Sequence, residues 1–191
     1  MTGSASSDQA DPDKARSLFR GKLWFWGPIA PLVALDLWSK SAAFSFLERH
    51  APLSIPEEGR FYDVIDGFFQ FVSWRNTGTV WGLAQDWNLA LVALRFVACG
   101  LVVFFAWQTA TRERLQQLVF GLILAGAIGN LYDNLTQPHG GVRDFLKFYL
   151  VVDGEPWVFP AFNVADSCIC VGAITLALLL WRRPAEESAS A

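Results

Sequence analysis

Three acidic residues in the second half of the chain occur in short polar blocks with similar spacing. Asn130 precedes Asp133 by three residues and Asn163 precedes Asp166 by the same step, which places amide and acid on one helical face. Asp144 lies between these blocks. Two carboxyl groups held close together share a proton, because the first negative charge opposes the second ionisation. The ionised member can then activate water while the other protonates a leaving amide nitrogen, so the sequence offers hydrolysis by acid–base catalysis.

Other kinds of site find less support in the sequence. No serine nucleophile motif, glycine-rich phosphate loop or paired-histidine helix is present, and we expect neither a metal nor a cofactor. The formal net charge of -3 gives no basic footprint, so we expect no nucleic-acid partner. Acids inside membranes also line proton and ion paths. By elimination alone, a transport or scaffold role therefore stays ahead of hydrolysis.

The elements that must position these acids are apolar helices. Charged residues make up 17% of the chain, against about 25% in soluble domains. They are nearly missing from segments close to the roughly 20 residues that a membrane-spanning helix needs. We predict an all-α membrane protein with four transmembrane helices, at about 23–40, 88–109, 116–132 and 164–181. This composition excludes a soluble globular enzyme and a disordered chain.

Basic residues predict the orientation of these helices. They gather before the first span, between the second and third, and after the fourth. The positive-inside rule then places both termini in the cytoplasm and the longer connections, 41–87 and 133–163, on the periplasmic side. We therefore predict one domain over 21–183 between a disordered tail, 1–20, and a short tail, 184–191.

The two periplasmic connections carry hairpin signals. Asp66-Gly67 separates two apolar-rich runs, and Asp153-Gly154 does the same in the second connection. We predict a small β-rich platform on the periplasmic side. The three acids of the polar blocks return to this same edge of the membrane.

Charged residues within the predicted spans need partners. Asp36 and Lys40 stand four apart on one helical face, and we interpret them as a structural ion pair. Arg95 has no suitably spaced acid on its own helix, so we expect another span to neutralise it. A ridge of small residues in the third span predicts close helix packing; it consists of Gly121, Ala125 and Gly129.

Five blocks occur in a fixed order between about 24 and 181. They are Asp36-Leu-Trp-Ser-Lys40, Asn76-Thr77-Gly78, Gly129-Asn130-Leu131-Tyr132-Asp133, Val142-Arg143-Asp144-Phe145 and Phe162-Asn163-Val164-Ala165-Asp166-Ser167. Together, on a four-span hydropathy pattern, they resemble the lipoprotein signal peptidases (signal peptidase II), the membrane aspartyl peptidases of bacteria.

The resemblance implies an intramembrane aspartic endopeptidase that removes signal peptides from diacylglyceryl-modified prolipoproteins, cutting before the lipidated cysteine. It implies Asp144 and Asp166 as the catalytic pair. The supporting positions that it implies are Asn130 and Asn163 near the site, Asn76 and Gly78 in a substrate-holding loop, and Asp36, Lys40 and Asp133 as structural support, with Asp133 the rival for a catalytic position. We expect a monomer in the bacterial inner membrane, with its site at the periplasmic face and in contact with membrane lipid.

The chain also departs from the pattern of that family. Asn134 stands where members usually have Arg, and Ala125 where they usually have Gly. Arg143 could supply the missing charge, and we expect it to lower the pKa of a neighbouring acid. These departures leave a second hypothesis, a paralogue of low or no activity that binds lipoproteins or signal peptides. The retained acids and amides favour the enzyme, and acids at one edge rather than the midplane disfavour a transporter.

Overall fold

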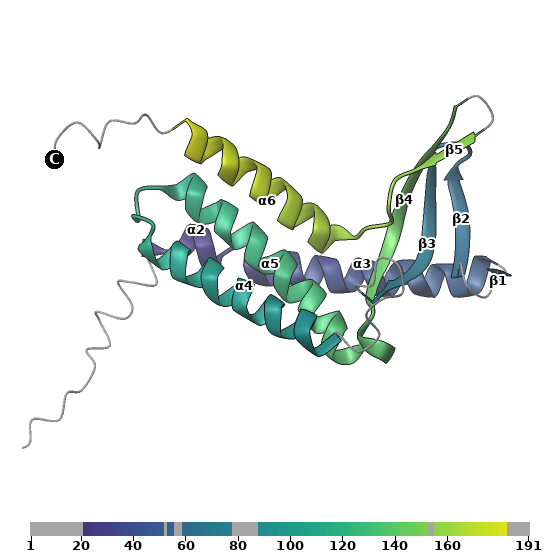
Figure 1. Cartoon of the computed structure of the whole chain (residues 1–191), viewed down its shortest axis with the longest axis horizontal. Coiled ribbons are helices and arrows are strands. Elements are labelled where there is room, and N and C mark those ends of the chain that lie inside the picture. The colour runs from purple at the N-terminus through teal and green to yellow at the C-terminus, as the bar shows by residue number, and fades with distance from the viewer. Residues whose placement is uncertain (1–20, 52, 56–58, 78–87, 153–154, 183–191) are drawn as a thin grey trace, which may run out of the picture.

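The computed structural model describes residues 21–51, 53–55, 59–77, 88–152 and 155–182. The helices are α2 (Leu23–Trp26), α3 (Ile29–His50), α4 (Asn88–Gln108), α5 (Arg114–Thr136) and α6 (Val164–Trp181). The strands are β1 (Leu53–Ile55), β2 (Gly59–Ile65), β3 (Phe69–Asn76), β4 (Val142–Val152) and β5 (Glu155–Val158), with a short 3₁₀ turn, η3 (Pro138–Gly140), before β4. The helices form a bundle, the strands form a sheet at one end of it, and α3 runs on past the bundle alongside the sheet (Figure 1).

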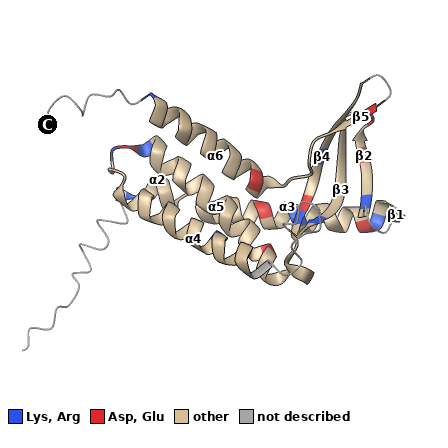
Figure 2. Cartoon of the chain, viewed as in Figure 1, with Lys and Arg blue, Asp and Glu red and all other residues tan. Residues whose placement is uncertain are grey.

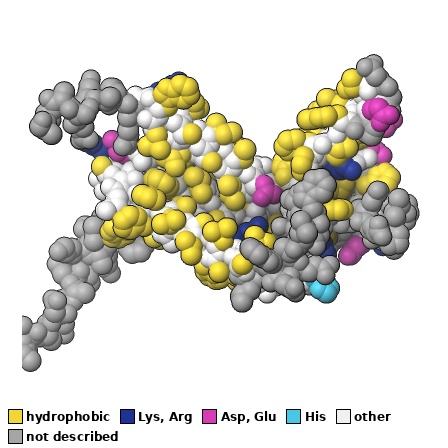
Figure 3. Space-filling model, viewed as in Figure 1, with side chains coloured by type: hydrophobic (Ala, Val, Ile, Leu, Met, Phe, Trp, Pro, Cys, Tyr) yellow, Lys and Arg dark blue, Asp and Glu magenta, His cyan; other side chains and the backbone are white. Residues whose placement is uncertain are grey.

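Three of the helices are long and apolar enough to cross a membrane, and they cover 90–108, 114–136 and 164–181. Only 6% of the apolar window of α4 is buried inside the protein, against 56% for α5. Helix α5 therefore forms the centre of the bundle, and it packs against α2, α3, α4 and α6. Apolar side chains cover much of the outer face of the bundle (Figure 3). The first predicted span lies in α2 and α3 and is not among these three, so a count of four spans stays a prediction.

The ridge of small residues on α5 brings this helix close to α2 and α3. A Cβ atom on Gly121 would lie 2.5 Å from the carbonyl oxygen of Phe25, and one on Gly129 would lie 2.5 Å from Oδ2 of Asp36. Ala125, between them, is 1% exposed. The close helix packing predicted from the sequence is therefore confirmed.

The strands form one antiparallel sheet in the order β1-β2-β3-β4-β5. The turn between β2 and β3 contains Gly67 with φ of 74°, a conformation that glycine adopts without steric cost, and it confirms the first predicted hairpin. Strands β4 and β5 pair around the second, although Asp153-Gly154 lies outside the described residues. The β3–β4 ladder pairs Asn76 with Val142 and so joins the two long connections into one platform.

Aromatic contacts attach the sheet to the helices. Phe46, near the end of α3, packs edge-to-face on Tyr62 and Phe71 of the sheet. Phe148 of β4 stacks on Phe162, just before α6. These contacts orient the start of β4 toward the start of α6.

A lysine fastens the end of the bundle farthest from the sheet. The Nζ atom of Lys22 donates to the carbonyl oxygens of Ala106 at 2.8 Å and Trp107 at 3.1 Å, and also to that of Thr109. Carbonyls at the C-terminal end of a helix lack partners within the helix. Lys22 therefore caps α4 from a distant part of the sequence.

Candidate functional site

The three polar blocks meet where the bundle joins the sheet, at the end of α5, the start of β4 and the start of α6. Acidic and basic segments gather at this junction, and an acidic one marks the sheet-side end of α6 (Figure 2). Of the acids in these blocks, Asp133 and Asp144 are 0% and 1% exposed, whereas Asp166 is half-buried. The junction thus combines enclosed carboxyl groups with one that reaches toward solvent.

Asp144 lies near the start of β4 and receives its hydrogen bonds from amides. The Nδ2 atom of Asn163 donates to its Oδ1 at 2.7 Å, and the side chain of Asn76 provides a further hydrogen bond. Burial, and then the charge of Asp166, raise the pKa of Asp144 to about 7, and the two amide hydrogen bonds only partly oppose this shift. Asp144 therefore exchanges its proton close to neutral pH.

Asp166 lies in the first turn of α6 and takes part in the helix cap. Its backbone N–H donates to Oδ1 of Asn163 at 2.9 Å, and its Oδ2 accepts from the backbone N–H of Asn163 at 3.1 Å. This reciprocal capping box is a common start of a helix, because it satisfies N–H groups that the helix leaves unpaired. The Nδ2 atom of Asn130, from α5, donates to Oδ1 of Asp166 at 2.7 Å. The cap and Asn130 together fix the orientation of this carboxyl group.

Amide side chains connect the two acids. The Nδ2 atom of Asn163, which donates to Asp144, also donates to Oδ1 of Asn130 at 3.2 Å. The Nδ2 atom of Asn130 in turn donates to Asp166. Among the residues that the structure describes, both carboxyl groups receive hydrogen bonds from amides rather than from Lys or Arg. The arrangement can hold one proton between two carboxyl groups, since amides accommodate either charge state.

A second polar group surrounds Asp133 and consists of Asp36, Lys40, Asp133 and Arg143, which we call the ion-pair cluster. The Nζ atom of Lys40 lies 2.7 Å from Oδ2 of Asp36 and 3.4 Å from Oδ2 of Asp133. The same Nζ donates to Oδ1 of Asn130 at 2.9 Å. The predicted ion pair between Asp36 and Lys40 is confirmed. Lys40 also pairs with Asp133, so this network of charges links α3 to α5.

Arg143 closes this cluster from the sheet. Its Nη2 atom lies 2.8 Å from Oδ1 of Asp133, and its backbone N–H donates to Oδ2 at 2.9 Å. Successive residues of a strand point to opposite sides, so Arg143 and Asp144 face different partners. Arg143 therefore pairs with Asp133, and the expected lowering of a neighbouring pKa is not found at Asp144, whose pKa is raised by burial. Asp133, the rival for a catalytic position, lies fully buried between two cations.

Arg95, whose partner the sequence does not identify, points from α4 toward α5. Its Nη1 atom donates to the carbonyl oxygen of Asn130 at 3.3 Å and to the side-chain oxygen of Asn134. Asn134 also donates to the carbonyl oxygen of Gly140. The residue that departs from the family pattern is therefore the one that holds Arg95 beside the site. Sequence spacing could not reveal this contact, because it depends on the packing of α4 against α5.

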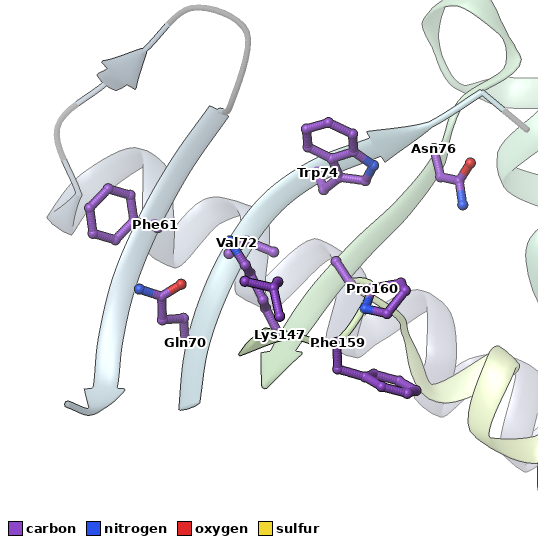
Figure 4. Close-up of a pocket in the computed structure, with 10 residues that line it drawn as sticks. Phe61, Gln70, Val72, Trp74, Asn76, Lys147, Phe159 and Pro160 are labelled. Carbon is purple, nitrogen blue, oxygen red and sulfur yellow. The ribbon is translucent and has the colours of Figure 1, made fainter. Parts of the chain in front are cut away.

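Asn76 stands at the end of β3 and is exposed. Besides contacting Asp144, it lines a cavity of about 680 Å³ on one face of the sheet. Figure 4 shows its side chain beside Trp74 and Pro160 at the rim of this cavity, whose other labelled residues are Phe61, Gln70, Val72, Lys147 and Phe159. The sequence did not predict the cavity, although the alternation of β3 places 70, 72, 74 and 76 near one another. Gly78 lies outside the described residues.

In the part of the chain that the structure describes, no three His, Cys, Asp or Glu side chains are grouped so that they could bind a metal ion. The chemistry of the described site therefore rests on carboxyl groups, amides and two kinds of cation. The acids bonded by amides and the acids bonded by cations lie next to each other, joined through Asn130.

Comparisons with known proteins identify relatives along most of the chain. The lipoprotein signal peptidase of Xanthomonas axonopodis pv. citri (strain 306) is 36% identical over 153 residues, which are 78% of this chain and 80% of that protein. The lipoprotein signal peptidase of Serratia proteamaculans (strain 568) is 34% identical over 177 residues, 88% of this chain and 92% of that one.

Two solved structures, each described as a bacterial membrane enzyme, share the fold. One has a TM-score of 0.65 and 22% identity, covering 92% of this chain and 94% of the other. The second has a TM-score of 0.64 and 23% identity, covering 88% and 95%. The model of the family described as signal peptidase (SPase) II matches residues 29–182. The chain belongs to the signal peptidase II family of bacterial membrane proteases.

Proposed function

We propose that the chain removes signal peptides from diacylglyceryl-modified prolipoproteins by cutting the peptide bond before the lipidated cysteine. Membership of the signal peptidase II family supports this reaction. The observation that carries the chemistry is the pair of acids, Asp144 and Asp166, linked through the amides of Asn163 and Asn130. The enzyme is then an aspartic endopeptidase whose pair shares one proton.

The shared proton belongs to Asp144 at neutral pH and below, because burial raises its pKa to about 7. Asp166, half-buried, then acts as the base. It takes a proton from water as the water oxygen bonds to the scissile carbonyl carbon, and Asp144 gives its proton to the departing nitrogen as the C–N bond breaks. At the end of the reaction Asp166 carries a proton and Asp144 does not, so the pair still holds one proton.

The remaining polar residues support this pair. Asn130 and Asn163 orient the carboxyl groups, and Asp36, Lys40, Asp133 and Arg143 hold α3, α5 and β4 together around them. Asn76 joins Asp144 to the cavity on the sheet, so the substrate segment next to the cleaved bond lies along Asn76. Gly78 belongs to the same sequence block and helps to hold the substrate. The departures at Asn134 and Ala125 leave both acids and both amides in place, and they alter the substrate preference or the rate of the reaction.

The domain of 21–183 crosses the inner membrane four times, through about 23–40, 88–109, 116–132 and 164–181. Asp36 and Lys40 neutralise each other at 2.7 Å, which lowers the cost of placing this charged helix in lipid. The tails, 1–20 and 184–191, are cytoplasmic, and the sheet and acids lie at the periplasmic face. A monomer suffices, since the residues of the proposed site come from one chain. A substrate anchored by its acyl chains then reaches the acids laterally.

The test is cleavage of a diacylglyceryl-modified precursor by purified protein carrying Asp144→Asn or Asp166→Asn. Loss of an acid or base typically costs about 10²–10⁴-fold in rate, and we expect each variant to lose at least that much while remaining folded. Asp66→Asn, in the exposed turn between β2 and β3, is the matched control. Cleavage near the wild-type rate by either site variant would refute the assignment of that acid.

A binding protein without activity is the less favoured alternative, since both acids and both amides are present and in contact. Restoration of lipoprotein processing in a strain that lacks its own enzyme separates the two. A folded wild-type protein that binds the precursor without cleaving it would favour the binding protein.

A further inference from the structure

The charges of the ion-pair cluster cancel among themselves. Two cations, Lys40 and Arg143, face two acids, Asp36 and Asp133, and none of the four is more than 8% exposed. Buried charges are tolerated when they are paired in this way. The cluster therefore has no net charge to offer to the neighbouring acid pair.

Arg95 is a cation near the site that does not belong to the ion-pair cluster. It lies in α4, a helix of otherwise uncharged residues, and is half-buried. Within the described part of the chain, the guanidinium of Arg95 donates to neutral acceptors, namely the carbonyl of Asn130 and the side chain of Asn134. These acceptors orient the group without neutralising it.

Asn130 nevertheless connects Arg95 to the acid pair. Its carbonyl oxygen accepts from Arg95 at 3.3 Å, and its Nδ2 atom donates to Oδ1 of Asp166 at 2.7 Å. Asp133 is already compensated by Lys40 and Arg143. The pair of Asp144 and Asp166, which carries one negative charge when it holds one proton, is then the group whose charge Arg95 balances.

We propose that Arg95 is a positioning residue that keeps the pair of Asp144 and Asp166 at one shared proton, by balancing the single negative charge of the pair. The inference rests on the proposed aspartic mechanism and adds a residue from α4 to it. Its guanidinium stabilises the ionised carboxylate that activates water. Asn134 acts through Arg95, because it fixes the direction of the guanidinium.

Several charged groups face the acid pair and must be counted with Arg95. Lys40 and Asp36 approach from α3, Asp133 from α5, and Arg143 from β4. These four stay paired when Arg95 is replaced. Removal of Arg95 alone therefore takes one positive charge from the surroundings of the pair, and both ionisations of the pair move to higher pH.

The experiment measures the rate of precursor cleavage between about pH 5 and 9 for the purified full chain. We expect a bell-shaped profile for the wild type, because one acid must be ionised and the other protonated. Arg95→Met should move the whole bell upward by about one pH unit, so that the ratio of the rate at pH 8 to that at pH 6 rises about fivefold. Arg49→Met, which removes an exposed arginine at the end of α3, should leave the profile unchanged.

Two further variants restore the charge. Arg95→Lys should return the bell to within about 0.3 units of the wild type, since its charge is kept. The double exchange Arg95→Asn with Asn134→Arg should do the same, because the side chains at 95 and 134 already meet. A uniform loss of rate in Arg95→Met with an unshifted bell would reveal a merely structural role and overturn the proposal.

The outcome separates this inference from the proposed function. If Asp144→Asn and Asp166→Asn are inactive while Arg95→Met keeps the wild-type profile, the acid pair stands and the role of Arg95 falls. If either acid variant is active, the proposed mechanism falls first. Should Arg95→Met fold poorly, infrared titration of the protonated carboxyl band in Arg95→Lys and in the double exchange provides the readout, and a band midpoint that differs from the wild type by a unit or more counts against the proposal.

Discussion

Two pairs of acids lie side by side at the sheet end of the bundle, and their partners differ in kind. Asp36 and Asp133 contact the cations Lys40 and Arg143. Asp144 and Asp166 receive hydrogen bonds from the amides of Asn163 and Asn130. A neighbouring cation favours the ionised carboxylate, whereas an amide leaves a proton free to move. The identity of the hydrogen-bond donor therefore separates acids that hold helices together from acids that can do chemistry.

The two pairs are joined rather than independent. Oδ1 of Asn130 accepts from Lys40, while Nδ2 of the same residue donates to Asp166. A side-chain amide has one accepting and one donating end, so Lys40 fixes which end faces the acid pair. The ion-pair cluster thus orients a partner of Asp166 without contacting that acid itself.

The largest expected effect comes from a substitution in the ion-pair cluster. Asp133→Asn removes the acid shared by Lys40 and Arg143, and breaking a buried pair of this kind costs about 3–5 kcal/mol. We expect a large loss of folded protein, measured as thermal unfolding in detergent. Asp144→Asn, in which no buried cation loses its partner, should keep its stability. Equal stability of the two variants would remove the distinction between the pairs.

The next prediction tests the close packing of α3 against α5 at Gly129, beside the ion-pair cluster. Gly129→Ala would place a Cβ 2.5 Å from Oδ2 of Asp36, and overpacking of this kind costs about 1–3 kcal/mol. Gly100→Ala on α4 is the matched control, since no atom lies within 4 Å of its Cβ position. Thermal unfolding of both variants provides the comparison, and an undisturbed Gly129→Ala protein would contradict the close approach of α3 and α5.

A smaller effect tests the amide side. Asn163→Asp keeps a residue that caps helices well, but it removes an amide donor from Asp144 and adds a negative charge beside it. We expect the pKa of Asp144 to rise further, so that the alkaline limb of the pH profile moves upward by about one unit and the ratio of the rate at pH 8 to that at pH 6 rises about fivefold. Asn163→Ser, which keeps the cap and removes the amide donor without adding a charge, should move the alkaline limb in the same direction by a smaller amount. An unshifted profile in Asn163→Asp would show that the amide does not control the acid.

The smallest effect is on stability and depends on pH. The pKa of Asp144 is raised from 3.8 to about 7 in the folded protein, so the folded state binds this proton more tightly than the unfolded state. Stability from Asp144 is then present below about pH 4 and is lost as the pH rises to 7. Asp144→Asn does not lose stability in this way, so its melting temperature should exceed that of the wild type at pH 8 and match it at pH 4. A constant difference across this range would contradict the raised pKa.

Local spacing predicted the parts of the fold that depend on neighbouring residues. The ion pair between Asp36 and Lys40 follows from a step of four on a helix, and the β2–β3 hairpin follows from Asp66-Gly67. The ridge at Gly121 and Gly129 likewise lies on one face of one helix. In each case the partners are close in the sequence, or the pattern lies within one element.

Contacts between distant elements could not be predicted in the same way. The bond from Arg143 to Asp133 requires β4 to return beside α5, and the contact between Arg95 and Asn134 requires a particular register of α4 on α5. The five-strand sheet depends on the β3–β4 ladder, which no local signal encodes. Sequence blocks therefore identified which residues gather at the site, but the partners that set their charges emerged from the packing.

The lysine at the far end of the bundle also sets an order of assembly. Lys22 and Ala106 are separated by 84 positions, so their contact cannot form until α4 has been synthesised. The start of α2 is therefore joined to the end of α4 through Lys22 only after the chain has been made as far as Ala106.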